Sequence, residues 1–241
     1  MPVIAYILTA LGAYLLGSIP TGFLAAKAKG IDIRSVGSGN IGATNAMRVL
    51  GKPAGIFVLL MDALKGFGAC FLGELIVYLL APKAFAVDYC GNTNDMRYHF
   101  YMAFHDWRIV MEYTPIIAGI FAVLGHNYTC WLKFKGGKGI ATTAGVYLAL
   151  APWPLFIALL VFILAVLLTR YVSVGSIASA IALTAAVWIW PVLPPHNNIF
   201  LGSVTTALGV MAIYKHKTNI QRLMAGTENR FGTKKSPEVA K

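Results

Sequence analysis

The chain has few charged residues for its length, and acidic residues are the scarcest of them. Of its 241 residues, 12% are Asp, Glu, Lys or Arg and 58% are hydrophobic. A soluble domain of this size carries about twice that share of charge. A core of this size does not hold so much apolar surface, so lipid must act as the solvent for much of the chain. The composition predicts a single all-α integral membrane domain, residues 1–241.

Cysteine is equally scarce and shows no pattern. Cys70, Cys90 and Cys130 lie in different segments, so their spacing fits neither a disulfide framework nor a metal site. The nine acidic residues are outnumbered by 20 Lys and Arg. These basic residues cluster at the ends of apolar runs, which indicates loops between membrane spans rather than a nucleic-acid surface. The partner that the composition predicts is the lipid bilayer.

Long apolar runs recur along the chain. Arg170 is the one Asp, Glu, Lys or Arg between Lys138 and Lys215. The predicted membrane segments are Val3–Leu24, Pro53–Ala81, Tyr113–Leu132, Gly139–Thr169, Val172–Trp190 and Asn197–Tyr214.

The segment Gly139–Thr169 is too long for one span. As a single helix, its 31 residues would measure about 46 Å against a hydrocarbon core of roughly 30 Å. Pro152 and Pro154 near its middle favour two helices of about 13–16 residues, which are short for a bilayer and expected to pack inside the bundle.

The distribution of basic residues supports the same division. Three segments are rich in Lys and Arg, namely Lys27–Lys52, Lys133–Lys138 and the tail Lys215–Lys241. Seven spans place all three on one side of the membrane, as the positive-inside tendency requires. We therefore predict seven transmembrane helices, two of them short, with the N-terminus outside, the tail 215–241 in the cytosol and an external segment at 83–112.

The first polar cluster, Gly37–Asn45, is rich in glycine and in uncharged donors. Gly37 to Gly42 satisfy the letters G-x-G-x-x-G, but the strand and crossover helix of a dinucleotide-binding fold are absent. Glycines let backbone amides approach an anion, and Arg34 and Arg48 supply cations that grip phosphate bidentately. A flexible polar turn is the alternative; the density of donors beside two arginines favours an anion site.

The second cluster, Phe134–Gly139, combines glycines with two lysines. It lacks the first glycine of a phosphate-binding P-loop, and Gly139 replaces the final Ser or Thr. Lys138 nevertheless lies at the expected start of a helix, where free amides attract an anion. A basic marker of the cytosolic side, followed by a flexible turn, explains the same residues equally well.

The third cluster follows the last span. His216 and Asn219 share a helical face, with Arg222 one turn further along. A basic helix on the membrane surface would explain the lysines but not this pairing of His and Asn. His126 is interpreted as an interfacial histidine with a partner.

Within the predicted spans, Asp62 and Lys65 are expected to pair inside the bundle and to serve structure first. Ser173 and Ser176 follow Arg170 and Tyr171 at a cytosolic span end, where they either line the same groove as the polar clusters or merely pack helices.

Three motifs together resemble the signature of the bacterial PlsY acyltransferases. They are Ser38–Arg48, Gly125-His126 with Phe134–Thr142, and His216–Leu223 with Gly226 and Glu228, and Asp62–Gly66 resembles the family's second-span pattern. The segment 83–112 is longer than expected. The resemblance covers nearly the whole chain and implies an enzyme of the bacterial inner membrane with its active site facing the cytosol. It implies transfer of an acyl group from acyl phosphate to the sn-1 hydroxyl of glycerol 3-phosphate, giving lysophosphatidic acid and phosphate in phospholipid biosynthesis.

The resemblance also implies residue roles. Catalytic roles fall on Ser38, Arg48, Lys138, His216 and Asn219. Substrate-binding roles fall on Gly39, Asn40, Thr44, Asn45, Gly136, Gly137, Ser173, Ser176, Arg222 and Glu228. In these roles Ser38 and Arg48 hold a phosphate. Lys138, with the amides of Gly136 and Gly137, binds the other anion. His216 and Asn219 orient glycerol 3-phosphate, and Glu228 braces the tail. No metal or cofactor is implied, and activity as a monomer is expected.

The expected chemistry needs no protein nucleophile. None of the five histidines is followed by Asp five positions later, as it is in other glycerolipid acyltransferases, and acyl phosphate is already activated. Binding two anions side by side and stabilising the developing charge suffice. The proton acceptor is either His216 or a substrate phosphate oxygen, of which we favour the second.

Two other classes of membrane protein are considered. One is a transporter of a phosphorylated solute, which the absence of sequence repeats disfavours, and the other is a structural membrane subunit.

Overall fold

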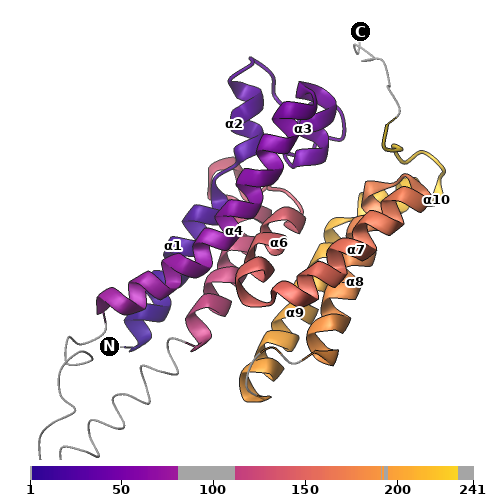
Figure 1. Ribbon diagram of the computed structural model, residues 1–241. Coiled ribbons are helices and arrows are strands. Elements are labelled where there is room, and N and C mark those ends of the chain that lie inside the picture. Colours follow the sequence, from indigo (N-terminus) through magenta and orange to yellow (C-terminus); the bar gives the residue numbers. More distant parts are fainter. Residues whose placement is uncertain (1, 81–111, 191, 193–194, 233–241) are drawn as a thin grey trace, which may run out of the picture. The chain divides into compact units, whose positions relative to one another are not determined.

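The computed structural model describes residues 2–80, 112–190, 192 and 195–232 (Figure 1). Within this part the secondary structure is helical. The chain divides into two compact units, Met1–Leu150 and Ala151–Lys241, each described by itself. The predicted external segment 83–112 lies outside the described residues except for Glu112, as does the end of the predicted cytosolic tail.

The first unit is built around one long helix. Its elements are α1 (Pro2–Ser18), α2 (Thr21–Lys27), α3 (Ala43–Leu50), α4 (Lys52–Leu80), a helix over 112–127, the 3₁₀ turn η2 (Cys130–Leu132) and α6 (Ile140–Leu150). Pro20 separates α1 from α2, since proline lacks the amide that would continue a helix. Gly51, at φ 93°, separates α3 from α4, in a conformation that glycine adopts without strain.

Helix α4 contacts α1, α3 and α6. Its approach to α6 is so close that a Cβ on Gly145 would lie 1.8 Å from the carbonyl oxygen of Ala63, and a Cβ on Gly66 2.1 Å from that of Thr142. Glycine is therefore required at both contacts. Small residues of this kind let membrane helices pack backbone to backbone, and here they hold the start of α6 against the middle of α4.

The second unit contains α7 (Pro152–Thr169), α8 (Val172–Ile189), α9 (Pro195–Lys215) and α10 (Lys217–Met224). Helix α8 packs against both α7 and α9. The turn between α7 and α8 contains Arg170 with φ 62°, a left-handed conformation that ends α7. The short basic helix α10 follows α9 almost directly.

The membrane fold expected from composition is confirmed. Six helical segments in the described part are long and apolar enough to cross a bilayer, and α6 adds a shorter apolar helix. The predicted break within Gly139–Thr169 falls at Ala151, because α7 begins at Pro152 and proline is tolerated in a first helical turn.

The expected length and burial of the two resulting helices are partly wrong. Helix α6 has 11 residues and α7 has 18, so only α6 is short. Most side chains of α7 are exposed within the structure rather than packed inside a bundle, because α7 is almost purely apolar and therefore suited to lipid on several faces.

Candidate active site

The first polar loop, residues 28–42 between α2 and α3, is organised by one buried side chain. The Nδ2 of Asn45 donates to the carbonyl oxygens of Ile33, Val36 and Asn40 at 3.2, 3.2 and 2.9 Å. Its Oδ1 accepts from the amide of Ser38 at 2.8 Å. Gly37 and Gly39 take positive φ, and a Cβ on Gly37 would lie 2.2 Å from that Oδ1. The loop is therefore a fixed structure and not the flexible turn considered as the alternative.

This arrangement changes the role expected for Asn45. Its side chain was predicted to face a substrate, but it is buried and both of its polar atoms bind the loop itself. Asn40 is used similarly, since its Oδ1 accepts from the amide of Gly42 at 2.8 Å. The side chains of Ser38 and Thr44 are half-buried at the surface of the loop and the first turn of α3.

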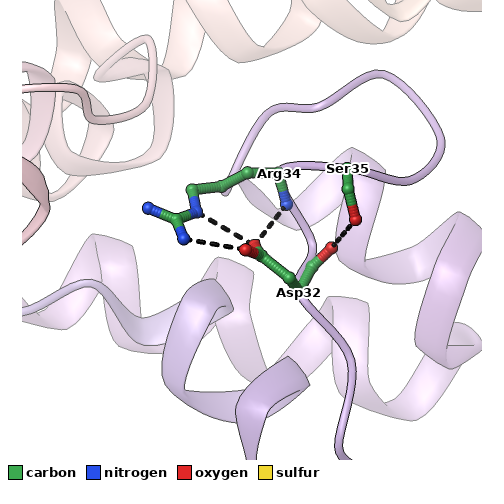
Figure 2. A network of polar contacts seen from close by, with 3 residues as sticks. All are labelled: Asp32, Arg34 and Ser35. Atoms are coloured by element: carbon green, nitrogen blue, oxygen red, sulfur yellow. Dashed lines mark hydrogen bonds and ion pairs between the residues drawn. The ribbon is translucent and has the colours of Figure 1, made fainter.

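Arg34 also has a different role from the one predicted. Its guanidinium forms two hydrogen bonds to the carboxylate of Asp32, at 2.9 and 2.7 Å, as Figure 2 shows. The Ser35 hydroxyl donates to the Asp32 carbonyl at 2.9 Å. The bonds from Arg34 lower the pKa of Asp32 to about 2. Arg34 therefore closes the loop through Asp32, whereas Arg48 lies on α3 and is exposed.

The second loop, residues 133–139, turns back on the end of the helix over 112–127. The Thr129 hydroxyl accepts from Trp131, and its carbonyl accepts from the amide of Phe134 at 3.0 Å. Lys133 and Phe134 both have positive φ, 53° and 60°, an unusual conformation for residues other than glycine. Strain of this kind persists only where surrounding contacts enforce it.

The amides of Gly136 and Gly137 are engaged within the protein, contrary to the prediction that they bind an anion. They donate to the carbonyls of Asn127 and His126 at 3.2 and 3.0 Å. Lys138 and the start of α6 are the other parts of the predicted anion site, since amides at a helix N-terminus attract an anion. The glycines instead permit close packing, since a Cβ on Gly136 would lie 2.1 Å from the His126 carbonyl oxygen.

The first loop and the turn directly before the second loop pack in the same hydrophobic cluster. Ile33 and Ile41 of the first loop lie with Leu132, which directly precedes the second, and with Val58 of α4. The Thr129 hydroxyl donates to the carbonyl of Ser18 at the end of α1, at 2.6 Å. The structure thus joins the first and second predicted clusters at one end of the first unit.

A buried group of ionisable side chains adjoins both loops. Lys65 Nζ lies 2.8 Å from Asp62 Oδ1, as the pairing prediction required, and His126 Nδ1 lies 3.6 Å from the same oxygen. A small pocket is bordered by these three side chains and by Ser18, Ile19, Pro20, Thr21, Gly22, Ile41 and Thr129. The part played by Thr129 and by the end of α1 was not predicted. Ser18 directly follows the apolar run of the first predicted span, whereas Thr129 lies within a predicted span and carried no such sign.

In the second unit, Glu228 links the third cluster to the start of α8. Its Oε1 accepts from Ser173 Oγ at 2.9 Å and from Asn219 Nδ2 at 2.8 Å. The amide of Phe231 donates to the carbonyl of Arg170 at 2.6 Å, so residues 226–231 return to the turn between α7 and α8. The structure therefore joins Ser173, Asn219 and Glu228, while Ser176 donates to Val172 of its own helix.

His216 lies between α9 and α10 and is buried. Its Nδ1 is 2.7 Å from the carbonyl oxygen of Ala212. A carbonyl only accepts, so Nδ1 carries the proton in the neutral ring. Arg222 on α10 is half-buried.

The chain is similar to known proteins in both sequence and structure. The family model of glycerol-3-phosphate acyltransferase matches residues 7–226. A glycerol-3-phosphate acyltransferase of Geobacter metallireducens is 46% identical over 93% of this chain and 97% of its own length. The corresponding protein of Desulforamulus reducens is 40% identical over 97% and 98%.

Solved structures also match. The crystal structure of PlsY, an integral membrane glycerol 3-phosphate acyltransferase, in its glycerol 3-phosphate form is 37% identical and superposes with a TM-score of 0.72, covering 95% of this chain and 96% of that one. Its lysophosphatidic acid form is 36% identical, with a TM-score of 0.69. The chain therefore belongs to the glycerol-3-phosphate acyltransferase family of integral membrane enzymes.

Proposed function

We propose that this protein transfers an acyl group from acyl phosphate to the sn-1 hydroxyl of glycerol 3-phosphate, giving lysophosphatidic acid and inorganic phosphate. The observation that carries the proposal is one hydrophobic cluster in which Ile41 of the first basic loop packs with Leu132, the residue directly before the second basic loop. Two anionic substrates need such neighbouring sites. The solved relatives, in their glycerol 3-phosphate and lysophosphatidic acid forms, support the same acceptor and product.

The chemistry requires positioning more than covalent catalysis. The acceptor oxygen attacks the acyl carbon, the bond from that carbon to the phosphate oxygen breaks, and phosphate departs. The hydroxyl proton passes to a phosphate oxygen of a substrate. Acyl phosphate is a mixed anhydride, so the reaction proceeds without a protein nucleophile, metal or cofactor once both anions are held in line.

In the first unit, we assign one phosphate to Ser38, Thr44 and Arg48, at the junction of the first loop and α3. Lys138 takes the second anion, together with the first amides of α6. Asn40 and Asn45 hold the loop in shape, as do the positive φ of Gly37 and Gly39. Fixed cations and amides stabilise the charge that develops on the carbonyl oxygen and the leaving phosphate.

In the second unit, His216 and Asn219 orient the glycerol 3-phosphate hydroxyl, with Arg222 contributing charge. The bond from Nδ1 to the carbonyl of Ala212 fixes the orientation of the imidazole ring. Glu228 fixes Asn219 through their 2.8 Å bond, so it acts through Asn219. The protein works as a monomer in the bacterial inner membrane, with these groups facing the cytosol.

The decisive experiment supplies the purified protein in detergent with palmitoyl phosphate and glycerol 3-phosphate. We expect phosphate and lysophosphatidic acid to appear in equal amounts and only when both substrates are present. Palmitoyl-CoA in place of palmitoyl phosphate should give no product, and EDTA should leave the rate unchanged. No phosphate release, combined with transport of a phosphorylated solute in liposomes, would contradict the proposal.

The role of His216 is tested by His216→Ala at saturating glycerol 3-phosphate. If a substrate phosphate accepts the proton, we expect KM to rise by about 10-fold or more while measurable turnover remains. Complete loss of turnover in a folded variant would identify His216 as the proton acceptor instead.

A further inference from the structure

The buried cluster of Asp62, Lys65 and His126 takes no part in the reaction proposed above. Their side chains are 3%, 6% and 5% exposed. Charged groups in a membrane span are costly and are retained where they hold a functional arrangement. The question is what this cluster arranges.

His126 connects the cluster to the second loop. Its Nδ1 faces Asp62 Oδ1 at 3.6 Å, while the opposite edge of the ring lies under Gly137. A Cβ on Gly137 would be 2.0 Å from Nε2, so the loop backbone rests directly on the imidazole. The amide of Gly137 also donates to the carbonyl of His126 at 3.0 Å. The ring is therefore a support between a carboxylate and the turn that precedes Lys138.

Lys65 connects the cluster to the bend after α1. Its Nζ contacts Asp62 at 2.8 Å and donates to the carbonyl of Ile19 at 3.0 Å. Asp62 and Lys65 lie on α4, His126 on the helix over 112–127 and Ile19 beside Pro20. One network thus fixes three segments around the support on which Gly137 rests.

We propose that Asp62, Lys65 and His126 are positioning residues that hold the Gly136–Gly137 turn in place and thereby place the ammonium group of Lys138. The proposal rests on the proposed function in one respect, namely that Lys138 binds an anionic substrate. In this proposal the three side chains act on the substrate through the turn and Lys138.

The first test measures hydrogen exchange by mass spectrometry on the full-length protein in detergent. In His126→Asn, and in Asp62→Asn/Lys65→Met, where both buried charges are removed together, we expect the amides of residues 136 and 137 to exchange at least 10-fold faster. Thr9→Val is the control, because Thr9 is also fully buried in the first unit but does not line the pocket. Unchanged exchange at the turn, or equal acceleration throughout the unit, would overturn the proposal.

The second test is a double-mutant cycle with Lys138. His126→Asn and Lys138→Met should each raise KM for the same anionic substrate by about 10-fold or more, with a smaller change in kcat. If His126 acts through Lys138, the double variant should match Lys138→Met alone, because the group being placed is absent. Multiplication of the two effects would contradict positioning.

The proposed reaction and the proposed positioning role can be refuted independently of each other. An inactive wild-type protein would refute the reaction but leave the exchange experiment to decide the role of the cluster. An active protein whose turn is unaffected by both cluster variants would refute only the positioning role.

Discussion

At the scale of single residues, polar side chains in this protein often bind their own loops. Asn45, Arg34 and the amide of Gly137 were each predicted to face an anion, yet each has a partner within the protein. Residue type alone predicts donors but not where they point. One acceptor of the Asn45 side chain, the carbonyl of Ile33, lies 12 residues away from Asn45 in the sequence. Only folding brings these two groups together.

Asn45→Ala should destabilise the protein. It removes the side chain that serves three carbonyls and the Ser38 amide, which leaves buried polar groups without partners. We expect a loss of about 2–4 kcal/mol in the free energy of unfolding, from a typical cost of about 1–3 kcal/mol per unsatisfied group. Thermal unfolding in detergent measures it.

The matched control is Asn40→Asp. An Asp retains the acceptor that Asn40 offers to the Gly42 amide, so its unfolding temperature should stay close to that of the wild type. A loss as large as that of Asn45→Ala would show that any change in this loop is damaging, whatever the hydrogen bonds.

Glu228 offers a second prediction at this scale. Glu228→Ala removes the acceptor shared by Ser173 and Asn219, so Asn219 loses its fixed orientation, and we expect kcat/KM for glycerol 3-phosphate to fall by at least about 10-fold, the effect of one charge-assisted hydrogen bond. Glu228→Gln retains Oε1 as an acceptor and should keep most of the activity. Equal loss in both variants would indicate that the negative charge, rather than the bridge, matters.

At the scale of helices, the sequence pattern predicted more of the structure than it did for single side chains. The bilayer restricts the conformations that a membrane span can adopt. Long uncharged runs must form helices, since every backbone group needs a partner inside the bilayer. Pro152 opens α7 as expected of a residue that ends one helix and begins another. The depth of burial of α7 was not predictable, since an apolar side chain suits lipid and protein neighbours equally.

Two glycines of this region test the packing of α4 against α6. Gly145→Ala places a Cβ 1.8 Å from the Ala63 carbonyl oxygen, so the two helices must separate, and we expect a loss of about 3 kcal/mol or more. Gly68→Ala has no atom within 4 Å of its new Cβ and should stabilise α4 by about 0.5–1 kcal/mol. Thermal unfolding of both variants provides the comparison, and a destabilising Gly68→Ala would count against the packing argument.

At the scale of the whole molecule, the basic segments predict an orientation in the membrane. The prediction places the segment 83–112 outside and the loop after α2 in the cytosol. In a cysteine-free background, Cys90 alone should react with a membrane-impermeant maleimide in intact cells. Lys29→Cys, at an exposed position of the first unit, should react only after permeabilisation. The reverse pattern would invert the topology and move the proposed site to the other side.

The sequence by itself determined the solvent of this protein, its helical class, the break near Pro152 and the three polar clusters that identify its family. These properties follow from composition and from neighbours along the chain. The tertiary structure decided which polar atoms remain available, because Asn45, Arg34 and Gly137 find their partners only when separate segments close on one another. It also placed the His126 ring between Asp62 of α4 and the backbone of Gly137, an arrangement that depends on contacts among three separate segments.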